Sequence, residues 1–324
     1  MKTPRRLFLT LCFCLLAACA APSTQSSQPP ASADTPDAAE TTSEPAPLEP
    51  AATEPPGATP TSAPLPTTIP ALPVEPVRIE FQASDGTPLV GYYYPSAVNP
   101  APVVVLMHWA SGSQCDWVHV NLVQWLQNRG APEGVAANPA CAGVSINYSI
   151  PLADYPIMPG DGSFAVFTFD FRGHGESGGE NTSQPEGYLQ DAQAAVNFAR
   201  GLSGANAQLL VTIGASIGAD GAVDSCTTGC LGALSFSPGG YLGIDYPLAV
   251  TAMDQASKPA WCVVSTQDGE SYPACEAASG DLFQKFVYEQ PAHGLQFFQP
   301  GFEPSAPQVI LDFLMQVFGF YSQT

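Results

Sequence analysis

The sequence predicts an α/β fold in which a mostly parallel central sheet is covered by helices on both faces. Two observations carry this prediction. Apolar runs such as Pro102–Trp109 are typical of strands buried on both faces, and they alternate with segments of helical periodicity. One such run, Leu209–Ile213, leads directly into Gly214–Gly218, a Gly-x-Ser-x-Gly motif at the junction of a strand and a helix.

The expected elements follow in chain order. Residues 77–84 and 89–95 predict a hairpin, because Asp85-Gly86 stands between two strand-like runs. Further strands are expected at 102–109, 164–171, 209–214, 232–237, 260–266 and 286–290. Helices are expected at 117–128, 185–202, 219–225 and 306–318. A sheet of this kind binds its ligands at the carboxyl ends of its strands.

Residues 1–19 have the pattern of an export signal. Three positive residues precede the apolar run Leu7–Ala18, which is too short to span a bilayer because a span needs about 20 residues. The end of the run, Leu16–Cys19, resembles the lipobox of bacterial lipoproteins. The resemblance implies cleavage before Cys19 and attachment of lipid to its sulfur. An ordinary secretory signal peptide is the alternative, and both interpretations predict export from the cytoplasm.

Residues 20–76 have the composition of a disordered tether. They hold 15 of the 34 prolines, seven acidic residues and no Lys or Arg, and no hydrophobic period that could build a core. Residues 77–324 then suit one α/β domain. Without the three positive residues of the leader, six Lys and Arg stand against 29 Asp and Glu, a formal net charge of −23. Nucleic acid is therefore not expected as a partner.

Six cysteines fall in the predicted domain. An even number in an exported domain favours disulfides, although six cysteines allow 15 pairings. Their neighbourhood along the chain favours the pairs Cys115–Cys141, Cys226–Cys230 and Cys262–Cys275. A zinc site of Cys115, His119 and Cys141 is the alternative, without a Cys-x-x-Cys pattern to support it.

Ser216 is the expected nucleophile. A serine on a sharp turn between strand and helix exposes its Oγ, and the flanking glycines let the strand and helix backbones pass closely. The expected general base is His293, which follows the last strand and so lies at the same edge of the sheet. His108 and His174 are expected to hold their loops by hydrogen bonds.

Asp268 is the expected partner of the base, because it follows an apolar strand and precedes His293 by 25 residues. The order Ser216, Asp268, His293 is the one found on this type of scaffold. Glu270 and Asp245 are the alternative acids. The oxyanion is expected to bind the backbone N–H groups of Ile217 and of Ala110, which stands in the loop 108–112.

These motifs resemble an α/β-hydrolase, close to the single-domain esterases of the dienelactone hydrolase and prolyl-oligopeptidase-like branch. The segments that carry the resemblance are 85–92, 108–112, 170–177, 214–218, Asp268 and His293. It implies acyl-ester chemistry by a Ser-His-Asp triad without a cofactor or a metal. The chain departs from the pattern in reading His-Trp at 108–109, where many members read His-Gly, and in the insertion 130–162. That insertion is expected either to cover the site as a lid, with Tyr148, Tyr155 and Met158 as pocket walls, or to pack on the surface.

The predicted function is therefore that of an ester hydrolase in the bacterial cell envelope, anchored by lipid on Cys19 and monomeric. Its substrate would be a small-molecule ester. A serine peptidase of the same fold and a non-catalytic binding lipoprotein are the alternatives. Turnover of esters, turnover of peptides, or neither would separate the three.

Overall fold

The computed structural model describes residues 72–129, 138–160, 162–181 and 185–319. All of them belong to the unit Thr67–Thr324. The predicted leader lies outside the described residues, as does the predicted linker up to residue 71. Within the described ranges, no helix is long and apolar enough to cross a membrane.

The centre of the fold is an eight-stranded sheet with the order β1-β2-β4-β3-β5-β6-β7-β8. The predicted hairpin pairs β1 (Val77–Gln82) with β2 (Pro88–Tyr94), and β2 also pairs antiparallel with β4. From β4 to β8 every pair of neighbours is parallel. These strands are β3 (Ala101–Met107), β4 (Ala165–Phe169), β5 (Ala205–Ala215), β6 (Ala233–Phe236), β7 (Ala260–Ser265) and β8 (Phe283–Tyr288).

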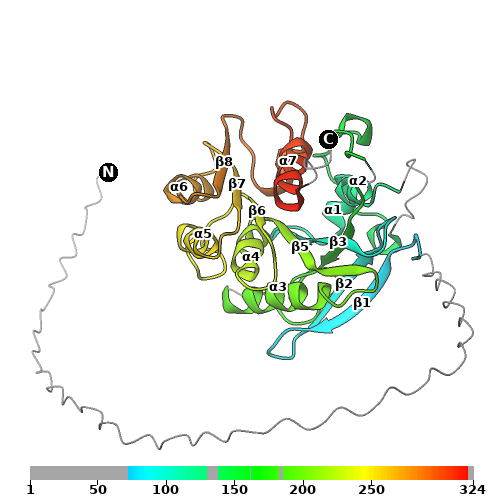
Figure 1. Cartoon of the computed structure of the whole chain (residues 1–324). Coiled ribbons are helices and arrows are strands. Elements are labelled where there is room, and N and C mark those ends of the chain that lie inside the picture. Colours follow the sequence, from blue (N-terminus) through cyan, green and yellow to red (C-terminus); the bar gives the residue numbers. More distant parts are fainter. Residues whose placement is uncertain (1–71, 130–137, 161, 182–184, 320–324) are drawn as a thin grey trace, which may run out of the picture. The chain divides into compact units, whose positions relative to one another are not determined.

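Helices cover both faces of the sheet, as Figure 1 shows. One face carries α1 (Cys115–His119), α2 (Leu122–Gln127) and α7 (Ala306–Phe318). The other carries α3 (Pro185–Ala199), α4 (Ile217–Cys226), α5 (Tyr246–Gln255) and α6 (Ser271–Ala277). Among the described residues, three short 3-10 helices lie in the connections: η2 (Pro139–Cys141), η3 (Leu152–Asp154) and η4 (Gly294–Phe298). The predicted fold class, a mostly parallel sheet between two helical layers, is confirmed.

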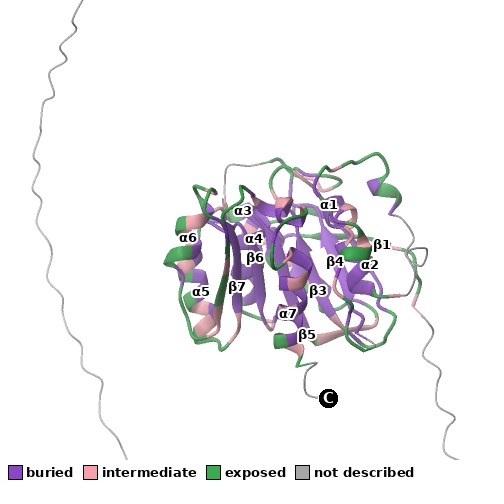
Figure 2. Cartoon of the chain, turned by 90° about the horizontal axis from the view of Figure 1, so that it is seen from above, coloured by how far each residue is buried: buried purple, intermediate pink, exposed green. Residues whose placement is uncertain are grey.

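Strand β3 shows why the sheet is rigid. Its side chains alternate between the two faces, so that Val104 and Leu106 enter one core while Val103 and Val105 enter the other. All four are fully buried. The central strands are buried along most of their length in Figure 2. A sheet packed on both faces gives a fixed edge on which catalytic groups can be placed.

The predicted helix 117–128 is wrong as a single element. The structure has α1 and α2 instead, separated at Asn121, whose φ of 66° cannot continue a right-handed helix. The Asn121 side chain donates a hydrogen bond of 3.1 Å to the Ile150 carbonyl, which stabilises the break. Asparagine tolerates this backbone region better than most residues.

Candidate active site

Ser216 occupies the sharp turn between β5 and α4. Its φ of 53° and ψ of −118° are sparsely populated for a residue with a side chain, and such strain costs on the order of 1–3 kcal/mol. Two glycines make the turn sterically feasible. A Cβ on Gly214 would lie 1.8 Å from the Gly218 carbonyl oxygen, and one on Gly218 would lie 2.2 Å from the Met107 carbonyl oxygen. The spacing of the motif is thus required by packing.

The structure brings Ser216, His293 and Asp268 together at the carboxyl end of the sheet. The His293 Nε2 lies 2.9 Å from the Ser216 Oγ, and the His293 Nδ1 lies 2.8 Å from the Asp268 Oδ2. With the proton on Nδ1, His293 donates to the carboxylate, and Nε2 accepts from the serine hydroxyl. This geometry fits a serine nucleophile with a general base and an orienting acid.

Asp268 is held as an anion despite its burial. Desolvation raises its pKa, but hydrogen bonds from His293, Ser237 and the Ser271 backbone outweigh that effect, and the net pKa lies below the usual value. The alternative acids do not fit. Asp245 and Glu270 are exposed residues at the starts of α5 and α6, and His293 has no hydrogen bond to either among the described residues.

Ser237 is a site residue that the sequence analysis did not identify. It follows β6, is fully buried, and has a φ of 56°. Its Oγ accepts a hydrogen bond of 3.0 Å from the Gly294 N–H, and its hydroxyl lowers the pKa of Asp268. Ser237 therefore ties the loop of the acid to the loop of the base. Its place at the end of a parallel strand was the only signal in the sequence.

The two predicted oxyanion donors lie on the segments that flank Ser216. Ile217 is the first residue of α4, and Ala110 stands in the loop that follows β3. Among the described residues, neither backbone N–H donates a hydrogen bond to another protein group. Both donors are therefore free for a ligand. The first turn of a helix is also a favourable place for negative charge.

Hydrogen bonds from neighbouring loops hold the segment 108–114. His108, fully buried, contacts the Trp109 carbonyl through Nδ1 and accepts from the Phe171 N–H, and burial lowers its pKa to about 3. His174 contacts the Ala110 carbonyl at 2.9 Å. Both histidines have the structural role predicted for them.

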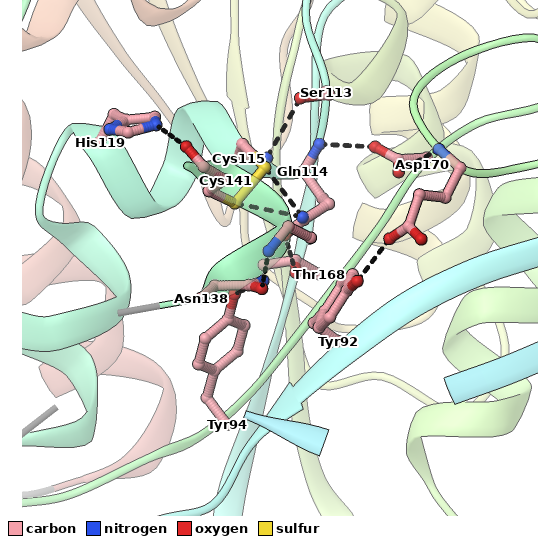
Figure 3. The surroundings of a disulfide bond; sticks show 12 residues. Tyr92, Tyr94, Ser113, Gln114, Cys115, His119, Asn138, Cys141, Thr168 and Asp170 are labelled. Carbon is pink, nitrogen blue, oxygen red and sulfur yellow. Dashed lines mark hydrogen bonds between the residues drawn. A yellow bond between two sulfur atoms is a disulfide. The ribbon is translucent and has the colours of Figure 1, made fainter. Parts of the chain in front are cut away.

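The Cys115–Cys141 disulfide lies immediately behind this loop (Figure 3). Gln114, next to it, places its Nε2 3.0 and 3.3 Å from the two sulfurs, and its backbone N–H donates to Asp170 at 2.8 Å. The bridge joins α1 to η2, within the predicted insertion. Cys226–Cys230 and Cys262–Cys275 are also paired, which is the pairing favoured from the sequence.

The alternative zinc site is wrong. Its two cysteines are bonded to each other, and the His119 Nε2 contacts the Cys141 carbonyl instead. Over the described parts of the chain, no group of three or more His, Cys, Asp or Glu side chains is arranged to hold a metal ion.

Trp109 forms one wall of the site. Its ring stacks against the His293 ring at a centroid distance of 6.4 Å, and its Nε1 donates a 2.7 Å hydrogen bond to Asp116. The Tyr148 ring packs edge-on against the Trp109 ring, with the two ring centroids 5.5 Å apart. Tyr148 is thus near the site, one ring away from His293.

The other two predicted pocket walls are wrong. The Tyr155 ring packs against Trp125 of α2, and its hydroxyl donates to the Val120 carbonyl. Met158 is buried in the same core. Their apolar side chains therefore fill the space beside α2. Residues 130–137 of the predicted lid lie outside the described residues.

A comparison with protein-family models gives no match. Among curated proteins, the uncharacterized protein YfhR of Escherichia coli K12 is 32% identical over 148 residues, which are 45% of this chain and 40% of that protein. Its counterpart in Salmonella typhi is 30% identical over 165 residues, 49% of this chain and 44% of that protein. The chain thus matches less than half the length of these relatives.

Solved structures share the fold at low sequence identity. An esterase of Pyrococcus furiosus, Pf2001, aligns with a TM-score of 0.53 and 16% identity over 75% of this chain and 91% of that one. The α/β-hydrolase GrgF of a Penicillium species aligns with a TM-score of 0.53 and 13% identity over 77% of this chain and all of that one. Together with the sheet order and the turn at Ser216, these likenesses show that the chain has the α/β-hydrolase fold.

Proposed function

We propose that this protein is a serine hydrolase that cleaves carboxylic esters by two-step acyl transfer. The observation that carries the proposal is the continuous set of hydrogen bonds from Asp268 through His293 to the Ser216 hydroxyl, at 2.8 and 2.9 Å. The backbone N–H groups of Ala110 and Ile217, which have no partner among the described residues, complete the arrangement. A non-catalytic binding protein would have no need for this triad together with two free backbone N–H groups.

The steps follow from the geometry. His293 Nε2 takes the Ser216 proton as the Oγ attacks the ester carbonyl, and Asp268 stabilises the resulting imidazolium. The oxyanion binds the two N–H groups, each of which contributes roughly 3 kcal/mol in the transition state. The imidazolium then gives its proton to the leaving alcohol. Water, activated by His293, releases the acid from the acyl-enzyme and restores Ser216.

We also propose that the domain acts outside the cytoplasm, attached to a membrane through lipid on Cys19. Three disulfides support an oxidising location, because such bonds are rare in the cytosol. The lipobox-like sequence Leu16–Cys19 supports the anchor.

The test is pre-steady-state hydrolysis of p-nitrophenyl acetate by the purified protein. We expect a burst of about one equivalent of nitrophenolate per active site, followed by slower turnover, and no burst from Ser216→Ala. Cleavage of peptides but not esters would instead identify a peptidase. If neither esters nor peptides were cleaved, the result would instead favour a non-catalytic binding protein.

A further inference from the structure

A surface cavity of about 630 Å³ lies beside the loop that carries Ala110. One wall is Ser111–Ser113, the continuation of that loop, together with Asp116. The other wall is the segment Val144–Tyr148. A volume of this order suits a small ligand, since binding sites commonly measure about 300–1,000 Å³.

Trp109 connects the cavity to the catalytic groups. Its ring stacks on His293, while it also contacts two residues that line the cavity, Asp116 and Tyr148. An ester whose carbonyl oxygen is bound at the Ala110 N–H can therefore extend over Ser111 into this space. Ala110 and Ser111, which follow Trp109 in sequence, are both exposed.

Hydrogen bonds to Asp116 hold the wall of the cavity that contains Gly112 in a defined geometry. A Cβ on Gly112 would lie 2.0 Å from the Asp116 Oδ2 and 2.4 Å from the Trp109 Nε1, so the Trp109–Asp116 hydrogen bond requires glycine there. The Tyr148 hydroxyl also donates to the Asp116 Oδ2, at 3.4 Å. Asp116 thereby fixes both aromatic rings.

The lining is polar and lacks positive charge. Ser111, Ser113, Ser145 and Asn147 line it beside Val144 and Ile146, and none of the described residues that line it is Lys, Arg or His. An alkyl chain would cover these groups without replacing their hydrogen bonds to water, which is unfavourable. A carboxylate or phosphate would meet the Asp116 carboxylate without a compensating cation.

We propose that this cavity is a substrate subsite for an uncharged, hydroxyl-rich group, such as a sugar ring or a polyol chain, on one side of the scissile ester. Hydroxyl groups both donate and accept, as do the serine and asparagine side chains of the lining. The inference rests on the proposed esterase function and specifies its substrate class.

The test compares matched esters. On the alcohol side, methyl 6-O-acetylglucoside is paired with cyclohexylmethyl acetate, and on the acyl side, methyl gluconate is paired with methyl hexanoate. We expect kcat/KM to be at least about tenfold higher for the hydroxylated member of one pair, which identifies the side of the ester that enters the cavity. No preference in either pair would overturn the subsite. A preference for acetylcholine over 3,3-dimethylbutyl acetate that exceeds the hydroxyl preference would also overturn it, in favour of a cation site.

A matched pair of variants locates the effect. Asn147→Leu removes an exposed amide of the lining, whereas Asn197→Leu removes an exposed amide on α3, away from the cavity. Asn147→Leu should lower kcat/KM for the preferred hydroxylated ester roughly fivefold, mainly through KM, and change its unhydroxylated partner less than twofold. Asn197→Leu should change neither. Equal losses on both esters for Asn147→Leu would contradict the proposal.

A binding measurement separates this proposal from the proposed function. Methyl glucoside and methyl gluconate should each be titrated into Ser216→Ala, with tryptophan fluorescence as the signal, since Trp109 contacts Tyr148 and Asp116 of the lining. Saturable binding of one of them, weakened in the Ser216→Ala/Asn147→Leu double variant, supports the subsite even if no ester is hydrolysed. Hydrolysis of p-nitrophenyl acetate without saturable binding of either compound leaves the esterase and removes the subsite.

Discussion

At the residue scale, Asp268 has the most specific chemical task. Its carboxylate fixes the imidazole of His293 with the proton on Nδ1, so that Nε2 faces the Ser216 hydroxyl. Asp268→Asn keeps the shape but favours the other tautomer. We predict a loss of at least about 100-fold in kcat, with an unchanged circular dichroism spectrum.

The two alternative acids of the sequence analysis serve as controls for this prediction. Asp245→Asn and Glu270→Gln should each retain kcat within about tenfold, because neither side chain contacts His293. Wild-type turnover in Asp268→Asn, together with a large loss in either control, would assign the acid to another residue.

Ser237 is a positioning residue, since it acts on Asp268 and on the backbone of the His293 loop. The Ser237 hydroxyl lowers the pKa of Asp268, so without it the Asp268 carboxylate should hold a proton more tightly. We predict that Ser237→Ala lowers kcat about tenfold and moves the acidic limb of the kcat/KM profile to higher pH.

Ser235→Ala provides the matched control. Its hydroxyl is equally buried on β6, but it donates to the Ala219 carbonyl, outside the triad. It should lower thermal stability without shifting the pH profile. A pH shift of equal size in both variants would reduce the role of Ser237 to packing.

At the scale of elements, α4 carries two buried aspartic acid side chains, Asp220 and Asp224. Asp220 accepts hydrogen bonds from the Gly239 and Tyr241 N–H groups, and so holds the loop that follows Ser237. Asp224 has no hydrogen-bond partner in the described structure for either oxygen. Burial, with a smaller contribution from Asp220, raises the pKa of Asp224 to about 8.

This raised pKa predicts a specific pH dependence of stability. Between about pH 4 and pH 8 the unfolded chain has released the Asp224 proton while the folded chain still holds it, so the free energy of unfolding falls as pH rises. Asp224→Asn removes this contribution. The free energy of unfolding of the variant, measured by urea unfolding, should rise relative to that of wild type by about 2 kcal/mol or more as the pH is raised from 5 to 8. The exposed Asp281→Asn should not, and an equal gain there would contradict the assignment.

The elements of the fold were predictable to different degrees. Strands such as β3 and β7 are buried on both faces, so their continuous apolar runs reveal them directly. The break between α1 and α2 was not predictable, because the tertiary contact of Asn121 with Ile150 decides it. The positions of Tyr155 and Met158 likewise depend on the path of the chain after η2.

At the scale of the whole molecule, the triad was predictable because each member follows a strand of one parallel sheet, and such strand ends meet at one edge. Trp109 could be expected at the wall of the site or in packing, because it stands in the loop after β3. Asp116 and Ser237 were not assigned site roles, since their contacts depend on loops that no local pattern specifies. The glycines at 214 and 218 show the opposite case, where steric need fixes the residue type.

The N-terminal segment gives a prediction for the whole protein. If Cys19 carries lipid, the protein expressed in a bacterium should fractionate with membranes and enter the detergent phase, because two acyl chains anchor stably. Cys19→Ala should move it to the soluble or the uncleaved precursor fraction. Wild-type protein that is soluble, with no added lipid mass, would contradict the anchor.

The central claim is that Ser216 is a nucleophile activated by His293, and covalent labelling tests it most directly. The purified protein should be incubated with a fluorophosphonate and analysed by peptide mass spectrometry. We predict one adduct per chain, located on Ser216, and a rate of labelling at least about 100-fold lower in His293→Ala. An unlabelled Ser216, or labelling that is as fast in His293→Ala as in wild type, would contradict the account.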